Sequence, residues 1–114
     1  DVQGACLRLT GAAALPGMIP VKLMPGGTFT IGRFDVSVGH QQSDFEFEKG
    51  TKTVSRRHAE IARMTDGSYR LSDIGSSAGT FLNGERLVKD VPRPLNPGDR
   101  VSFGTAGANY IWEE

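Results

Sequence analysis

Apolar and polar residues alternate along several short stretches of the chain, and turn-forming residues separate these stretches. Residues 44–48 alternate strictly, so that Phe45 and Phe47 share one face and the acidic side chains lie on the other. Residues 28–31 show the same two-residue period. This period is typical of a half-buried β-strand. No long stretch has the 3.6-residue period of an amphipathic helix, so the pattern predicts an all-β fold.

Dipeptides typical of tight hairpin turns join two pairs of these extended stretches. They are Asp66-Gly67, between residues 58–64 and 68–74, and Asn83-Gly84, between residues 80–82 and 85–88. Such residues tolerate the positive φ angles that type I′ turns require. Further short strands are expected at residues 7–10, 21–24, 100–103 and 109–112. Many short strands separated by turns predict a β-sandwich or a barrel.

Composition narrows the class of protein. The 114 residues are close to the commonest size of a single domain. Thirteen basic residues balance 13 acidic ones, which argues against binding to nucleic acid or to an anionic membrane surface. The single cysteine, Cys6, cannot form an internal disulfide and favours a reducing compartment, so we expect a cytoplasmic protein, with the nucleus as an open alternative. Because the chain begins with Asp1, we expect it to be part of a larger, multidomain protein.

Candidate catalytic and metal-binding groups are few. Cys6, His40 and His58 are the only cysteine and histidine residues, too few for a zinc site. The chain has no Gly-x-x-x-x-Gly-Lys loop for nucleotide phosphates and no Gly-x-Ser-x-Gly nucleophile motif. We therefore expect no cofactor, no metal and no catalytic role.

Three polar clusters follow or precede the predicted strands. They are Gly32-Arg33, Ser55-Arg56-Arg57-His58 and residues 75–80. The loops of a β-sandwich gather at its two ends, where separate clusters can meet. Together these clusters would offer guanidinium groups, hydroxyls and backbone N–H groups, which are the donors that bind a phosphate. Taken singly, each cluster is better explained as a solvated surface, a turn or, for His58, a structural histidine.

The order and spacing of four motifs resemble the forkhead-associated (FHA) domain. The motifs are Gly32-Arg33, Ser55-x-x-His58, Asp73-x-Gly75-Ser76-Ser77-x-Gly79-Thr80-Phe81-Leu82-Asn83-Gly84 and Leu95-x-Pro97-Gly98-Asp99-x-Val101-x-Phe103-Gly104. The resemblance covers about residues 21–112 and implies a β-sandwich of two mainly antiparallel sheets with about eleven short strands. Residues 1–20 would then be a flank or a first strand, and residues 113–114 the end of the fragment.

The FHA resemblance implies a function as well as a fold. Members of this family bind phosphothreonine in extended segments of partner proteins. Arg33 would pair with the phosphate, Ser55 and Arg56 would contact it, and His58 would brace the binding loops. The residues expected to bind the phosphopeptide are Arg33, Ser55, Arg56, Ser77, Ala78 and Asn83, and those expected to support the site are Gly32, His58, Gly79, Thr80 and Gly84.

Ala78 departs from the family pattern. The family often has Asn at this position, where the side-chain amide holds the backbone of the bound peptide. Alanine cannot form that hydrogen bond, and the chain also has an apparent insertion around residues 39–43. The alternative function is therefore a degenerate FHA-like sandwich that mediates phosphate-independent assembly between proteins.

Overall fold

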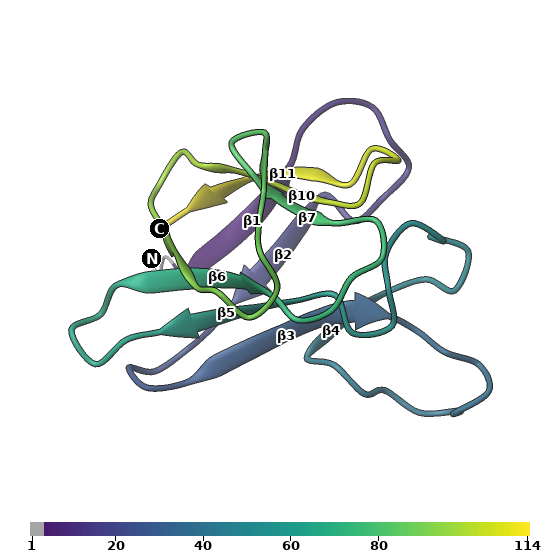
Figure 1. Cartoon of the computed structure of the whole chain (residues 1–114), viewed down its shortest axis with the longest axis horizontal. Coiled ribbons are helices and arrows are strands. Elements are labelled where there is room, and N and C mark those ends of the chain that lie inside the picture. Colours follow the sequence, from purple (N-terminus) through teal and green to yellow (C-terminus); the bar gives the residue numbers. More distant parts are fainter. Residues whose placement is uncertain (1–3) are drawn as a thin grey trace.

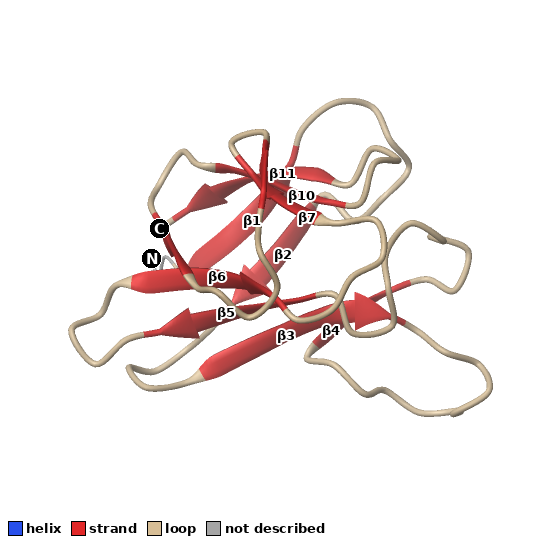
Figure 2. Cartoon of the chain, viewed as in Figure 1, coloured by secondary structure: helices blue, strands red, loops and turns tan. Residues whose placement is uncertain are grey.

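Two β-sheets face each other across the core of the computed structural model, which describes residues 4–114 (Figures 1 and 2). The strands are β1 (Ala5–Leu9), β2 (Met18–Val21), β3 (Thr28–Arg33), β4 (Phe45–Phe47), β5 (Ala59–Arg63), β6 (Tyr69–Asp73), β7 (Thr80–Leu82), β8 (Glu85–Arg86), β9 (Arg93–Leu95), β10 (Arg100–Phe103) and β11 (Asn109–Glu113). One sheet has the order β2-β1-β11-β10-β7-β8 and the other the order β4-β3-β5-β6-β9. The described residues include no helix that could cross a membrane. The predicted all-β sandwich is confirmed.

Both predicted hairpin turns join antiparallel strands. β5 pairs with β6 on either side of Asp66-Gly67, and the Asp66 carboxylate accepts a hydrogen bond from the backbone N–H of Ser68 at 2.9 Å. β7 pairs with β8 through Asn83 and Gly84, whose φ angles are 53° and 85°. Two successive positive φ angles form the type I′ turn that matches the twist of the strands it joins.

The end of β3 differs from the prediction, because the strand includes Gly32 and Arg33 instead of stopping at residue 31. These residues pair in parallel with β4, and Arg33 lies opposite Phe47. A Cβ atom on Gly32 would lie only 1.9 Å from the carbonyl oxygen of Arg56. Glycine therefore lets the loop after β4 lie directly against the end of β3, which brings Arg56 close to Arg33.

Two other strands also differ from the sequence pattern. The strand expected at residues 21–24 lies earlier, because β2 ends at Val21. β9 was not predicted, since Pro94 at its centre interrupts the pattern. β9 is the outermost strand of the five-stranded sheet, where the missing N–H of a proline is tolerated.

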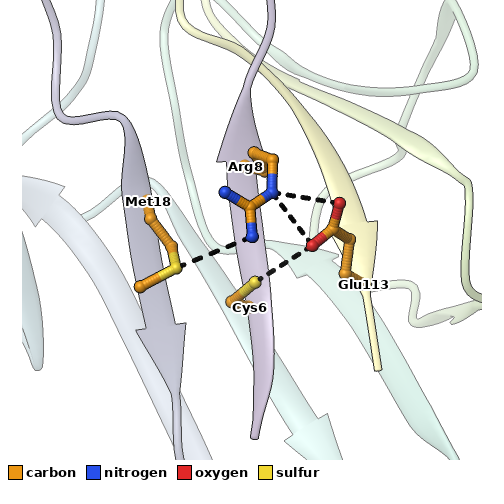
Figure 3. A network of polar contacts seen from close by, with 4 residues as sticks. All are labelled: Cys6, Arg8, Met18 and Glu113. Carbon is orange, nitrogen blue, oxygen red and sulfur yellow. Dashed lines mark hydrogen bonds and ion pairs between the residues drawn. The ribbon is translucent and has the colours of Figure 1, made fainter. Parts of the chain in front are cut away.

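The first strand belongs to the six-stranded sheet, because β1 pairs with both β2 and β11. A polar network on the outer face links the same three strands (Figure 3). Arg8 Nε donates to both carboxylate oxygens of Glu113, at 3.0 and 3.1 Å. The Cys6 thiol lies 3.6 Å from Glu113, and Arg8 Nη2 lies 4.0 Å from the sulfur of Met18.

Aromatic side chains between the sheets hold the short strand β4 in place. Phe47 is fully buried, and its ring centroid lies 6.1 Å from that of Phe103 and 6.2 Å from that of Tyr110. Burial of such a side chain contributes roughly 1.5–3 kcal/mol. Phe47 therefore anchors the two long loops that precede and follow β4, although the strand itself has only three residues.

Candidate functional site

Three loops converge at one end of the sandwich, at the right of Figure 1 and away from both labelled termini. They are the β3–β4 loop (residues 34–44), the β4–β5 loop (48–58) and the β6–β7 loop (74–79). An open pocket of about 580 Å³ lies between them. Its polar lining comprises Arg33, Ser55, Arg56, Arg57, Gly75 and Ser77, together with Gln42. The three polar clusters of the sequence thus meet at one place.

Arg33 is oriented by the backbone of the neighbouring loop. Its Nε donates a hydrogen bond to the carbonyl oxygen of Val54 at 2.7 Å, and Val54 is fully buried. Within residues 4–114, no carboxylate forms an ion pair with Arg33, and no hydrogen bond uses its two terminal nitrogens. A guanidinium group that is fixed in this way, with both terminal nitrogens unused, can hold two oxygens of a phosphate at once.

Arg56 reaches the pocket with a carboxylate beside it. Its Nη1 lies 2.9 Å from Oδ2 of Asp35, whose Oδ1 accepts hydrogen bonds from the hydroxyl and the backbone N–H of Ser37. The Ser37 hydroxyl, followed by Arg56, lowers the pKa of Asp35 to about 2. Asp35 is therefore ionised at neutral pH. Since three arginines line the pocket and Asp35 neutralises one of them, the pocket keeps an excess of positive charge.

Two serines connect the second and third loops. The backbone N–H of Ser77 donates to Oγ of Ser55 at 3.0 Å, and the two hydroxyl oxygens lie 3.2 Å apart. The Ser55 hydroxyl thus already accepts one hydrogen bond, and its own proton can be donated. An anion in the pocket can accept hydrogen bonds from these hydroxyls in place of the bond that they now share.

His58 links the same two loops from inside the fold, where its side chain is fully buried. The backbone N–H of Ser55 donates to Nδ1 at 3.0 Å, and Nε2 lies 2.8 Å from the carbonyl oxygen of Gly79. Because an N–H group can only donate and a carbonyl can only accept, the ring is neutral and carries its proton on Nε2. Burial lowers the pKa of His58, although the Gly79 carbonyl and Asp73 oppose the shift.

Asp73 holds the β6–β7 loop in its bent shape. Its carboxylate accepts hydrogen bonds from the backbone N–H of Gly75 at 2.8 Å and of Ser76 at 3.1 Å. It also accepts from the hydroxyl of Ser76 and from that of Thr80, the latter at 2.8 Å. Burial raises the pKa of Asp73, but these donors outweigh it and the net shift is downward. The loop is therefore shaped before any ligand arrives, with Gly75 and Ser77 at the pocket.

A family model for the FHA domain matches residues 29–104, which span the whole pocket. The chain belongs to the FHA family. This FHA domain is 41% identical over 91 residues to the oxoglutarate dehydrogenase inhibitor of Corynebacterium diphtheriae, covering 77% of this chain and 59% of that protein. It is 35% identical over 107 residues to the inhibitor of the same name from Corynebacterium efficiens, covering 89% of this chain and 71% of that protein. The chain thus spans less than two thirds of the first of these relatives.

The fold also matches solved FHA domains. The N-terminal FHA domain of Rad53p from Saccharomyces cerevisiae, solved in complex with a phosphothreonine peptide, superimposes with a TM-score of 0.73. The alignment covers 96% of this chain and 90% of that one, at 20% sequence identity. This likeness shows the same sandwich and the same arrangement of strands.

Two residues expected to contact a ligand do not line the pocket of this FHA domain. Ala78 follows Ser77 in the β6–β7 loop but is not part of the lining. Asn83 lies in the β7–β8 turn, where its amide donates to Asp99 at 3.1 Å and accepts from the backbone N–H of Arg100 at 2.9 Å. Gly84 completes that turn, so both residues shape the hairpin next to the site.

The pocket of the FHA domain also includes residues that the sequence pattern did not indicate. Arg57 is absent from the residues expected to bind the phosphopeptide, and it lines the pocket with Arg33 and Arg56. Val38 and Gln42 line it from the β3–β4 loop, which carries the apparent insertion. The insertion folds back because the carboxylate of Glu46 accepts hydrogen bonds from the backbone N–H groups of residues 42 and 43, at 2.7 and 2.9 Å. The acidic residue four positions after Gln42 was the available signal for this turn.

Proposed function

We propose that this FHA domain binds phosphothreonine in extended segments of partner proteins. The observation that carries the proposal is the state of Arg33, which a buried carbonyl orients and no carboxylate of the described residues neutralises. A phosphothreonine carries a charge of about −1.5 to −2 at pH 7, and charge-assisted hydrogen bonds to such a group are strong. The excess positive charge of the pocket matches that ligand.

Each residue of the pocket has a distinct part in the proposed complex. Arg33 donates hydrogen bonds from its terminal nitrogens to two phosphate oxygens. Arg56 contacts the phosphate while its ion pair with Asp35 keeps the arginine side chain in position. The hydroxyl groups of Ser55 and Ser77 donate hydrogen bonds to a phosphate oxygen. Unmodified threonine would leave these donors without an acceptor, so the pocket discriminates strongly in favour of the phosphorylated side chain.

The proposed role is non-catalytic. Both ring nitrogens of His58 are engaged by backbone groups, so this histidine is not placed to act as a base. The relatives from both Corynebacterium species are named as inhibitors of an enzyme, which supports a regulatory role through protein binding. We infer that the domain is one module of a larger cytoplasmic protein and that it binds phosphorylated partner proteins.

A second candidate function is phosphate-independent assembly with another protein. Ala78 favours it, because the loop beside the pocket lacks the amide that FHA domains often use to hold a peptide backbone. The two functions differ in one observable property, which is the dependence of binding on the phosphate.

A fluorescence-anisotropy titration separates these functions. One degenerate peptide pool is prepared with phosphothreonine, with phosphoserine or with unmodified threonine at its centre. We expect saturable binding of the phosphothreonine pool, weaker binding of the phosphoserine pool and no binding of the unmodified pool. Equal binding of all three pools would support the assembly role and contradict the proposal.

A further inference from the structure

A second, smaller cleft lies on the other side of the β6–β7 loop from the main pocket. It has a volume of about 340 Å³ and is lined by Asp73, Gly75, Ser76, Arg86, Leu87 and Lys89. Gly75 lines both the cleft and the main pocket. We propose that Arg86 and Lys89 form a second anion subsite, which takes a negatively charged side chain near the phosphothreonine of the same ligand. This inference rests on the proposed function of the main pocket.

Arg86 reaches from β8 over the β6–β7 loop. Its Nη2 donates to the carbonyl oxygen of Ser77 at 3.3 Å, and a Cβ atom on Gly79 would lie 2.9 Å from its Nε. The guanidinium group therefore lies against the loop that separates the two cavities. Like Arg33, it is anchored by a backbone carbonyl and forms no ion pair with a carboxylate of residues 4–114. The neighbouring acid Glu85 already pairs with Arg93, at 3.2 Å.

Lys89 approaches the loop from the segment that follows β8. A Cβ atom on Gly75 would lie 3.5 Å from Cε of Lys89, so the lysine stem covers this glycine. The backbone around Lys89 is held by a bridge to Asp73 and by the hydrogen bond from the N–H of Asp90 to the Asp73 carbonyl, at 2.8 Å. Its Nζ lies 4.0 Å from the Asp90 carboxylate, and both side chains are about two-thirds exposed. Such a long, exposed ion pair is weak, so an incoming anion can replace it.

The charge of the cleft favours an anion. Asp73 is the one acidic residue among those that line it, and its carboxylate already accepts four hydrogen bonds, three from the β6–β7 loop and one from Thr80. Arg86 and Lys89 thus face the cleft with an excess of positive charge. Because Gly75 lines both the cleft and the main pocket, one ligand can reach both. An extended peptide advances about 3.3–3.6 Å per residue, so the second anionic side chain belongs one to three residues from the phosphothreonine.

A peptide series with paired charges tests the subsite. The host is an alanine-rich phosphothreonine peptide. Each member of the series carries a single glutamate, or a single glutamine as its neutral counterpart, at one of the three positions on either side of the phosphothreonine. A phosphoserine then replaces the glutamate at the best position, which distinguishes a carboxylate from a second phosphate as the preferred group. We expect at least one glutamate position to bind about two- to fivefold more tightly than its glutamine counterpart, as one extra exposed charge pair would produce.

The same titrations on variants assign this preference to the cleft. Arg86→Gln and Lys89→Gln should each reduce the ratio of glutamate to glutamine affinity, and the double variant should bring it to about one. A purely structural role of Arg86 would weaken both peptides equally and leave the ratio unchanged. Lys22→Gln is the charge-matched control, because Lys22 lies at the opposite end of the sandwich beside Arg63 and Tyr69, and it should leave the ratio as in the parent protein.

Two results would overturn the subsite while leaving the main pocket intact. One is Arg33-dependent binding of the host peptide with equal affinity for glutamate and glutamine at every position. The other is a charge preference that survives in the double variant. A failure of the proposed function has a different signature, in which the phosphorylated and unphosphorylated host peptides give the same titration.

Discussion

The backbone N–H of Ser55 donates a hydrogen bond to Nδ1 of His58 at 3.0 Å, three residues further along the chain. The other ring nitrogen of His58 binds the carbonyl of Gly79, which precedes β7. One buried imidazole thus fixes the loop that carries Ser55 and Arg56 against the loop that carries Gly75 and Ser77. The geometry of the pocket depends on this residue although the ring does not line it.

Replacement of His58 should destabilise the domain. His58→Ala leaves the N–H of Ser55 and the carbonyl of Gly79 without partners and opens a cavity beside Phe103, whose ring centroid lies 5.7 Å from the imidazole. We expect a loss of about 2–4 kcal/mol in the free energy of unfolding. Urea denaturation measures it, with His40→Ala in an exposed loop as the control. A loss no larger than that of the control would contradict the bracing role.

The neutral state of His58 also predicts a dependence of stability on pH. The pKa of His58 is lowered in the fold from 6.5, so below pH 6.5 the unfolded chain takes up a proton that the folded chain resists. Stability should therefore be fully present above pH 6.5 and should fall as the pH decreases, by up to about 1.4 kcal/mol per pH unit until the folded-state pKa is reached.

Urea midpoints at pH 7.5, 6.0 and 5.0 measure this dependence. The lowered pKa values of Asp35, Asp66 and Asp73 reduce stability mainly below their ordinary value of 3.8, outside this range. His58→Gln should remove the decrease between pH 6.5 and 5.0. The same decrease in the parent and the variant would show that another group is responsible.

The close approach at Gly32 gives a third prediction. Gly32→Ala places a Cβ atom 1.9 Å from the Arg56 carbonyl oxygen, which forces the β4–β5 loop away from β3. Overpacking of this kind costs roughly 1–3 kcal/mol, and the displaced Arg56 should weaken binding of phosphothreonine peptides as well. Gly50→Ala is the matched control, since its Cβ would meet no atom within 4 Å. Thermal unfolding and peptide titration are measured for both variants. Equal stability and equal peptide affinity of the two variants would refute the prediction.

Local features of the sequence predicted the parts of the structure that local physics determines. Asn83 and Gly84 tolerate positive φ angles, and the hairpin that they predict is present. The strict alternation around Phe45 and Phe47 also marks β4. Patterns of this kind depend on neighbouring residues only, so the turn and the strand can be predicted from the sequence alone.

Features that depend on distant contacts could not be predicted in this way. The last residues of β3 are strand because β4 pairs with them in parallel after a loop of eleven residues, 34–44. Pro94 argues against a strand unless that strand is known to lie at an edge. Arg57 and Gln42 line the pocket because of how the β4–β5 and β3–β4 loops fold back. The turn at Gln42 depends on a hydrogen bond to the carboxylate of Glu46, which lies in β4.

Mapping the bound peptide by NMR tests the central claim most directly. A ¹⁵N-labelled domain is titrated with a phosphothreonine peptide at pH 7, where the phosphate is largely doubly charged. We predict that the largest shift changes occur at Arg33 Nε–H and at the backbone N–H groups of Ser55, Gly75 and Ser77, and that Arg33→Ala abolishes them. Changes that gather instead around Lys22 at the opposite end, or that the unphosphorylated peptide reproduces, would contradict the account.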